Sequence, residues 1–101
     1  MYIALSPVRS DIARTLIRRG DTLIVNGEPF DFTALQEGDI LPLDAVEGNW
    51  LGSAIERRGG DLHLTVILPH GVNAPAETLF PAPLHLTEDG PVDLPPYGDQ
   101  T

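Results

Sequence analysis

The sequence has no cysteine and few basic residues, and each shortage excludes a class of chemistry. Without cysteine, none of the 101 residues can form a disulfide or supply a thiolate. No apolar run approaches the roughly 20 residues that a membrane-spanning helix needs. Residues 1–7 do not resemble a secretion signal, because they lack a basic start and contain only a short apolar run. We therefore expect a protein of the cytoplasm, or of a particle assembled there, with no membrane partner.

The charge balance argues against direct binding of nucleic acid. All six basic residues are arginine, and fifteen acids give a formal net charge of −9. From His70 onward there are five acids and no base. A phosphate backbone is bound by cations that displace its counterions, and this chain offers few of them. The pairs Arg18-Arg19 and Arg57-Arg58 each stand beside a glycine turn, which favours solvated turn flanks over a joint anion site.

Motifs of catalysis and cofactor binding are also missing. The chain has no Gly-x-Ser-x-Gly nucleophile motif, no phosphate loop and no Gly-x-Gly-x-x-Gly fingerprint. Asp39, Asp44 and Glu47 are not spaced as calcium ligands of an EF-hand loop. The three histidines show no metal-binding spacing. We therefore predict a non-enzymatic protein with no catalytic residues, no cofactor and no metal.

Glycine and proline, ten of each, separate short apolar runs of strand length. This punctuation predicts an all-β domain. We expect a small antiparallel sandwich or partly open barrel of about six or seven short strands. Residues 1–95 form the single predicted domain, and residues 96–101 (PYGDQT) are a predicted flexible tail. The first strand is expected at residues 2–6, ended by Pro7.

Two turn signals within residues 14–32 predict a three-stranded meander. Gly20-Asp21 suits a type II′ turn and Asn26-Gly27 suits a type I′ turn, because these turns need positive φ at the glycine and asparagine positions. Both registers place apolar residues opposite apolar residues. The predicted pairs are Leu16 with Val25, Ile17 with Ile24, Leu23 with Phe30, and Ile24 with Pro29.

Residues 10–19 fit two structures. Ser10 could cap a helix that ends at Gly20, with Ile12, Leu16 and Ile17 on one face. A strand is favoured because the hairpin that follows needs a partner. The sequence leaves both alternatives open.

A further hairpin is predicted around Gly59-Gly60. Its register sets Glu56 opposite His63, as a surface pair rather than an acid–base dyad, and Leu51 opposite Leu68. One face of this hairpin is then apolar and predicted to be core. It carries Leu51, Ile55, Leu62, Leu64, Val66 and Leu68.

The stretch ILPHGVNAP contains the most unusual candidate, His70. It could be a general base or a metal ligand. The alternative is a stiff exit loop, in which Pro69 ends a strand, Gly71 allows positive φ and Asn73 forms a local turn. We favour the loop, because these residues explain the stretch without chemistry and no metal-binding pattern surrounds His70. A rigid exposed loop is also a suitable contact surface.

Four residues are predicted to contact a partner: Trp50, His70, Asn73 and Phe80. Trp50 is the only tryptophan and either fills the core or anchors an interface, where tryptophan is enriched. Phe80, in LFPAP, either packs on the sheet or inserts into a partner. An unpaired strand edge could also be completed by a strand of the partner.

Four phrases of the sequence resemble a group of small proteins encoded by tailed bacteriophages and prophages, among their tail and tail-fibre genes. They are LSPVRSD, GDTLIVNGEPFDF, ERRGGDLHLTVILPHG and NAPAETLFPAPLHLTEDGPVDLPP, which together cover nearly the whole chain. The resemblance implies an accessory role in tail assembly or as a minor virion component, with a phage structural or assembly protein as partner. The phrases are strand and turn patterns, so no catalytic residue is carried over.

Three other functions are consistent with the sequence. The charge of −9 suggests an acidic decoy that imitates DNA and blocks a host nucleic-acid-binding protein. A hydrolase would need His70 and a nearby carboxylate. Binding of a small ligand is the remaining alternative.

Overall fold

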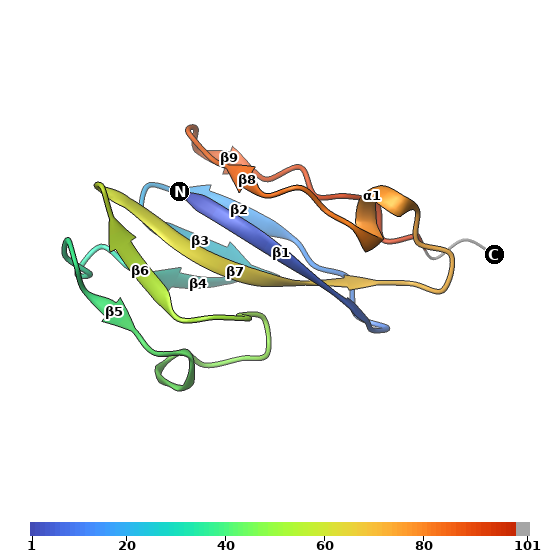
Figure 1. The fold of residues 1–101 in the computed structure, drawn as a ribbon, viewed down its shortest axis with the longest axis horizontal. Coiled ribbons are helices and arrows are strands. Elements are labelled where there is room, and N and C mark those ends of the chain that lie inside the picture. Colours follow the sequence, from blue (N-terminus) through green and yellow to red (C-terminus); the bar gives the residue numbers. More distant parts are fainter. Residues whose placement is uncertain (99–101) are drawn as a thin grey trace.

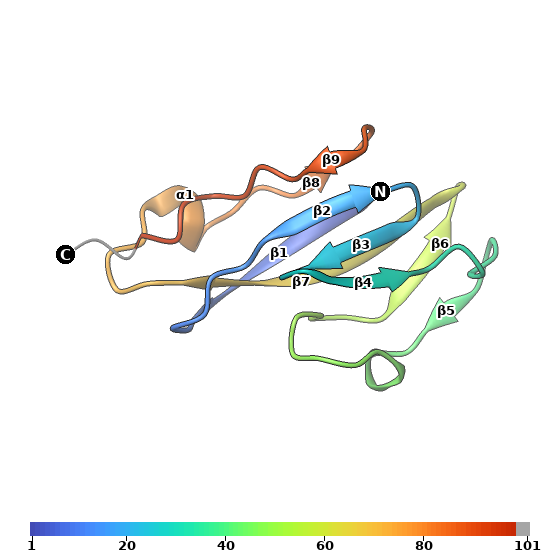
Figure 2. The same cartoon turned by 180° about the vertical axis from the view of Figure 1, so that it is seen from behind.

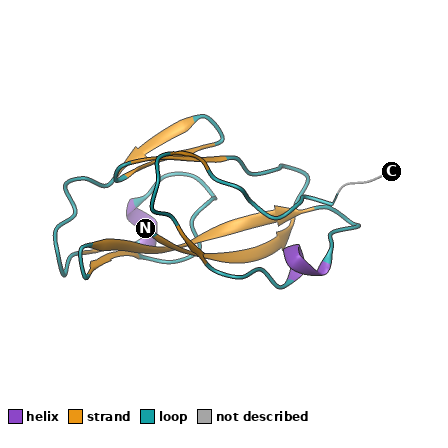
Figure 3. Cartoon of the chain, turned by 90° about the horizontal axis from the view of Figure 1, so that it is seen from above, coloured by secondary structure: helices purple, strands orange, loops and turns teal. Residues whose placement is uncertain are grey.

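The computed structural model describes residues 1–98 as two β-sheets that pack on each other around one core (Figures 1 and 3). This confirms the predicted all-β fold. The strands are β1 (Tyr2–Arg9), β2 (Leu16–Arg19), β3 (Thr22–Val25), β4 (Glu28–Asp31), β5 (Ile40–Leu41), β6 (Ile55–Arg58), β7 (Asp61–His70), β8 (Leu84–His85) and β9 (Gly90–Pro91). A 3₁₀ helix, η1 (Leu43–Ala45), and one helical turn, α1 (Ala76–Leu79), complete the secondary structure of this part of the chain.

The first sheet has the order β5-β6-β7-β1-β8, and the second, which faces the viewer in Figure 2, has the order β4-β3-β2-β9. Nine strands replace the six or seven expected, and three of them are only two residues long. The central pair of the first sheet, β1 and β7, is parallel, from Tyr2 opposite His63 to Arg9 opposite His70. The predicted sandwich is therefore present, but one of its sheets is mixed rather than antiparallel.

Pro7 does not end the first strand, which continues to Arg9. The amino group of Met1 donates to the carbonyl of Leu86, and the Met1 carbonyl accepts from the Leu86 N–H. Because backbone groups alternate along a strand, odd-numbered residues of β1 direct theirs away from β7. The nitrogen of Pro7 therefore points away from β7. Its missing N–H removes no hydrogen bond from the β1–β7 ladder, so the strand continues through Pro7.

Pro69 is likewise inside its strand, since β7 extends to His70. The N–H of Ile67 donates to the carbonyl of Trp50 at 2.7 Å, so odd-numbered residues of β7 direct their backbone groups away from β1. Pro69 follows the same alternation and removes no bond from the β1–β7 ladder. The predicted strand ends at Pro7 and Pro69 are thus both wrong for the same geometric reason.

The meander of the second sheet has the predicted register throughout. Asn26 (φ 49°) and Gly27 (φ 87°) occupy the left-handed region, as a type I′ turn requires. The Asn26 side chain also accepts from the N–H of Thr15 at 2.8 Å and donates to the carbonyl of Ala13 at 3.0 Å. These two bonds hold the preceding segment as an irregular connection, so residues 10–15 are neither the strand nor the helix considered above.

The β6–β7 hairpin keeps its predicted register only near the turn. Glu56 pairs with His63 as expected, but Leu51 pairs with Val66 instead of Leu68. Two additional residues of the β6 side are accommodated in the bulge around Gly52 to Ala54. A shift by two preserves which side chains face inward. All six residues predicted for the core face are therefore buried: Leu51, Ile55, Leu62, Leu64, Val66 and Leu68.

Trp50 is a core residue, with only 3% of its surface exposed. Its ring centroid lies 4.9 Å from that of Phe30 and 6.4 Å from that of Phe32, and its indole N–H donates to the carbonyl of Glu47 at 3.1 Å. Two rings and one hydrogen bond thus hold the indole within the fold. Trp50 is not an exposed contact residue, which corrects that part of the sequence prediction.

The flexible tail predicted for residues 96–101 does not begin at residue 96, because residues 96–98 are bonded to the rest of the fold. The carbonyl of Pro96 accepts from the Thr78 hydroxyl at 2.6 Å, and the Tyr97 hydroxyl donates to the carbonyl of Ser10. The carbonyl of Gly98 accepts from the N–H of Asn73 at 3.1 Å. Residues 96–98 are therefore part of the folded domain, and the rest of the predicted tail, residues 99–101, lies outside the described residues.

The Arg57 side chain connects the two sheets. It extends from β6 of the first sheet, is 13% exposed, and donates from Nη2 to Asp21 Oδ2 at 2.8 Å in the β2–β3 turn of the second sheet. The same guanidinium donates to the carbonyls of Leu35, Phe32 and Gly60. Arg57 is thus not a solvated turn flank, whereas the side chain of its neighbour Arg58 is 67% exposed.

Several carboxylates stabilise turns by accepting backbone hydrogen bonds. Glu37 accepts from the N–H groups of Gly59 and Gly60, both at 2.8 Å, and these bonds hold the pKa of Glu37 below its usual value. The Thr33 hydroxyl and N–H lower the pKa of Asp31 in the same way. A folded-state pKa below the unfolded one stabilises the fold at pH values above both.

We expect Arg57→Met to lower the free energy of unfolding by about 2–4 kcal/mol. Three backbone carbonyls lose a charged donor, and Asp21 loses its hydrogen bond and ion pair. Urea unfolding followed by tryptophan fluorescence measures this. The control is Arg19→Met, which removes an exposed arginine and should change stability by less than about 0.5 kcal/mol. Equal stability of the two variants would contradict the role given to Arg57.

We expect Glu37→Gln to reduce the pH dependence of stability. The contribution of the Glu37 carboxylate is present above its unfolded pKa of about 4.3 and is lost as the pH falls through the lower folded value. Urea midpoints should therefore fall less between pH 7 and pH 3 in Glu37→Gln than in the parent protein. Glu28→Gln, on an exposed position of β4, should keep the parent slope. If the urea midpoint of Glu37→Gln fell with pH as steeply as that of the parent protein, the two backbone bonds of Glu37 would not form in solution.

Candidate functional site

Three of the four predicted contact residues, His70, Asn73 and Phe80, lie on the segment that runs from the end of β7 through α1 (Figure 1). His70 is half-buried, and its Nδ1 lies 3.1 Å from the carbonyl oxygen of Gly71, so this nitrogen carries a proton. Within residues 1–98, His70 forms no ion pair with a carboxylate. The geometry orients the ring by a backbone carbonyl and gives it no acid–base partner.

The C-terminal segment holds this loop in place. The N–H of Gly71 donates to the carbonyl of Tyr97 at 2.8 Å, and Asn73 and Gly98 form the equivalent bond two residues on. Thr78 of α1 is fully buried and bonds to Pro96. Two chain segments thus stabilise each other, and residues 71–80 have a defined conformation at one end of the sandwich. The predicted loop differs in detail, because Gly71 does not adopt a positive φ and Pro69 lies inside β7.

Large apolar side chains are exposed on this fixed loop. Val72 is 67% exposed, Leu79 38% and Phe80 83%. We call these three residues the apolar loop. Phe80 in particular packs against almost nothing, although burial of a phenylalanine side chain contributes about 1.5–3 kcal/mol. An exposed apolar group on a well-ordered segment is typical of a protein contact.

The outer face of the first sheet carries a second arrangement, a stack of three rings across three strands. Tyr2 of β1 lies between His63 of β7, with centroids 4.8 Å apart, and His85 of β8, with centroids 4.0 Å apart. The planes are within 9° of parallel. Sequence reasoning missed this stack, because it depends on the parallel β1–β7 register, for which the sequence gives no local signal.

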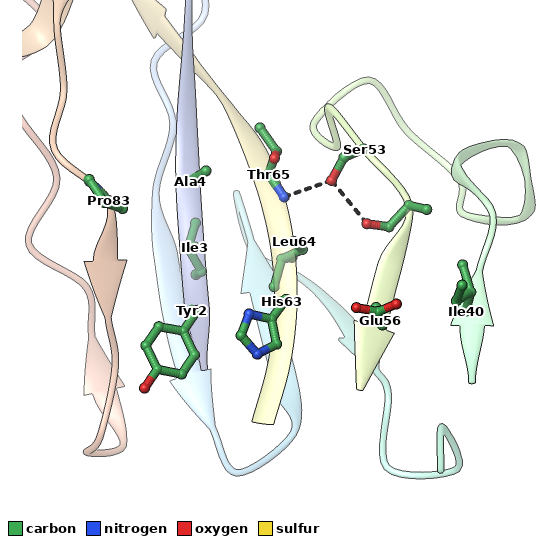
Figure 4. Close-up of a pocket in the computed structure, with 11 residues that line it drawn as sticks. Tyr2, Ile3, Ala4, Ile40, Ser53, Glu56, His63, Leu64, Thr65 and Pro83 are labelled. Atoms are coloured by element: carbon green, nitrogen blue, oxygen red, sulfur yellow. Dashed lines mark hydrogen bonds between the residues drawn. The ribbon is translucent and has the colours of Figure 1, made fainter. Parts of the chain in front are cut away.

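A hollow of about 480 Å³ adjoins the stack (Figure 4). Two of its polar side chains, Ser53 and His63, are hydrogen-bonded within the fold. Ser53 donates to the carbonyl of Ala54 at 2.9 Å and accepts from the N–H of Thr65 at 3.0 Å. His63 Nδ1 lies 3.2 Å from Arg58 Nη2, and its Nε2 lies 3.2 Å from the Arg58 carbonyl, which together select the neutral Nε2–H form. Ser53 and His63 are thus each bonded to other groups and not to one another, so they do not form a nucleophile–base pair.

The described part of the chain contains no group of three or more histidine, aspartate or glutamate side chains placed to hold a metal ion. None of its helices is long and apolar enough to cross a membrane. Comparisons of the chain with protein-family models, curated proteins and solved structures found no match. The function must therefore be inferred from the surfaces described above.

The ring stack can be tested by NMR. We expect the ring protons of His85 to resonate upfield of their random-coil positions, and to move downfield in Tyr2→Leu, because the phenol ring current acts at 4.0 Å. The coupling free energy between Tyr2→Leu and His85→Ala should be about 0.5–1 kcal/mol in a double-mutant cycle. His70, which is outside the stack, serves as the internal reference. Unchanged His85 shifts in Tyr2→Leu would disprove the stacked arrangement.

Proposed function

We propose that the protein is a non-enzymatic binding module that docks onto another protein through the apolar loop. The observation that carries this proposal is the 83% exposure of Phe80 on a segment fixed by hydrogen bonds to residues 96–98. A preorganised aromatic side chain can enter a partner's pocket without a further cost of ordering its loop. Asn73 and His70 lie on the same segment and supply polar groups beside the apolar ones.

The partner that we propose is a structural or assembly protein of a tailed bacteriophage or prophage. The resemblance of the four sequence phrases to proteins encoded among tail genes supports this class of partner. In this role the protein acts during tail assembly or as a minor virion component, in the bacterial cytoplasm or in the particle. The function needs a docking surface and no chemistry, which is in keeping with the absence of catalytic motifs in the sequence.

Docking by side chains is favoured over addition of a partner's strand. Two of the outer strands contain a proline, Pro29 in β4 and Pro91 in β9. The other two outer strands, β5 and β8, have two residues each and adjoin Pro42 and Pro83. Short or proline-bearing edges offer few backbone donors to a new strand.

The acidic decoy is the second candidate, supported by the net charge of −9. A decoy needs free carboxylates arranged like phosphates. Within residues 1–98, eight carboxylates form hydrogen bonds or ion pairs inside the fold: Asp11, Asp21, Asp31, Glu37, Asp39, Glu56, Asp61 and Asp89. Their internal roles leave fewer acids for mimicry, and this favours the docking module.

Affinity capture of the tagged protein from cells that produce the phage tests the docking module. We expect the parent chain to capture a tail protein. The Phe80→Asp variant should capture at least tenfold less of it, because a charge would replace the central apolar contact. Ile40→Asp is the matched control, because Ile40 is 60% exposed on β5 and outside the apolar loop. The free energy of unfolding of both variants should be within about 0.5 kcal/mol of the parent value.

A different result would favour the decoy. Capture of a basic host DNA-binding protein, equal in both variants and released by moderate salt, would overturn the docking module.

A further inference from the structure

A second concave region, distinct from the hollow of Figure 4, lies where the second sheet meets the end of β7 and the C-terminal segment. It measures about 480 Å³, which is within the range of small-ligand pockets. Its walls include Leu16 of β2, Leu68 of β7, and Val92 and Leu94 of the segment after β9. We call this region the Arg14 groove, because Arg14 is the one charged residue among the residues of 1–98 that line it.

Arg14 is held at the groove without an anionic partner. Its side chain is half-buried, and Nε donates to the carbonyl of Ile67 at 3.1 Å. That bond fixes the guanidinium and leaves its terminal Nη groups for another acceptor. Among residues 1–98, Arg9, Arg57 and Arg58 form ion pairs, but Arg14 forms none. Burial without a compensating charge lowers the pKa of Arg14.

Arg18 and Arg19 also form no ion pair within residues 1–98, but of these three arginines only Arg14 lines the groove. Fourteen of the chain's fifteen acidic residues lie within residues 1–98, and none of these fourteen lines the Arg14 groove. A partly desolvated cation gains more from a bound carboxylate than an exposed arginine does, because less water competes for it. The two Nη groups of a guanidinium match the two oxygens of a carboxylate in spacing and direction.

The groove walls exclude several other ligands. Four prolines line it: Pro69, Pro91, Pro95 and Pro96. Proline has no N–H, so these walls offer few backbone donors of the kind that surround phosphate groups. One cation with apolar walls therefore suits a ligand with one negative charge and an apolar body, and does not suit a nucleotide.

We propose that the Arg14 groove binds a small monocarboxylate with an apolar chain. The carboxylate accepts hydrogen bonds from the Nη groups of Arg14, and the chain lies against Leu16, Leu68, Val92 and Leu94. This site is separate from the apolar loop and does not depend on the docking function, so either proposal can fail without the other.

Titration of the isotope-labelled protein with hexanoate, octanoate and decanoate, followed by methyl NMR, tests the proposal. We expect shifts of the Leu16, Leu68 and Val92 methyl groups. Affinity should rise roughly two- to fourfold for each added methylene, as burial of the chain in an open groove predicts. Octanol and octylamine should bind at least tenfold more weakly than octanoate to the unmodified protein, because neither carries a carboxylate.

Arg14→Gln should weaken octanoate binding at least tenfold, and Arg14→Lys should retain part of it. Arg19→Gln, which removes an exposed arginine outside the groove, should leave binding unchanged. Octanoate affinity that is equal to that of octanol, or independent of chain length, overturns the proposal. So does unchanged affinity in a folded Arg14→Gln protein. The comparison of ligands on the unmodified chain decides the question even if Arg14→Gln does not fold.

Discussion

One guanidinium fixes how the two sheets are placed. Arg57 leaves β6 of the first sheet and ends on Asp21 of the second, and on its way it bonds to the carbonyls of Phe32 and Leu35, in the connection between the sheets. Apolar packing alone does not specify one arrangement, because it has no direction. A planar donor with several acceptors does specify one. The relative position of the sheets in turn determines the shape of the Arg14 groove, which both sheets line.

Local parts of the fold could be predicted from the sequence, and non-local parts could not. The turns at Gly20 and Asn26 are set by backbone preferences of a few residues, so their registers were correct. The parallel pairing of β1 with β7 joins segments about sixty residues apart, and no pattern in either strand names its partner. Whether a proline interrupts a strand depends on which side its nitrogen faces, so Pro7 and Pro69 were misread.

The same division holds for the candidate sites. His70, Asn73 and Phe80 lie on one segment because they are close in sequence, and their role as contact residues stays a prediction. Trp50 was assigned wrongly as a contact, since the rings beside it come from β4 of the other sheet (Phe30) and from the residue that follows β4 (Phe32). The ring stack at Tyr2 and the Arg14 groove both arise from pairings between distant segments. The alternation of β7 predicted that His63 faces outward, but not which ring it would meet.

Prolines at the outer strands also have a consequence for crowding. Copies of a β-protein at high local concentration tend to extend one another's sheets, because an unpaired edge accepts any chain. Here Pro29 and Pro91 remove donors from two edges, and the other two edges are too short to support a ladder. Many copies can therefore accumulate side by side, as on a repetitive particle, and each remains a separate folded unit. The proline content that fragments the strands thus also limits self-association.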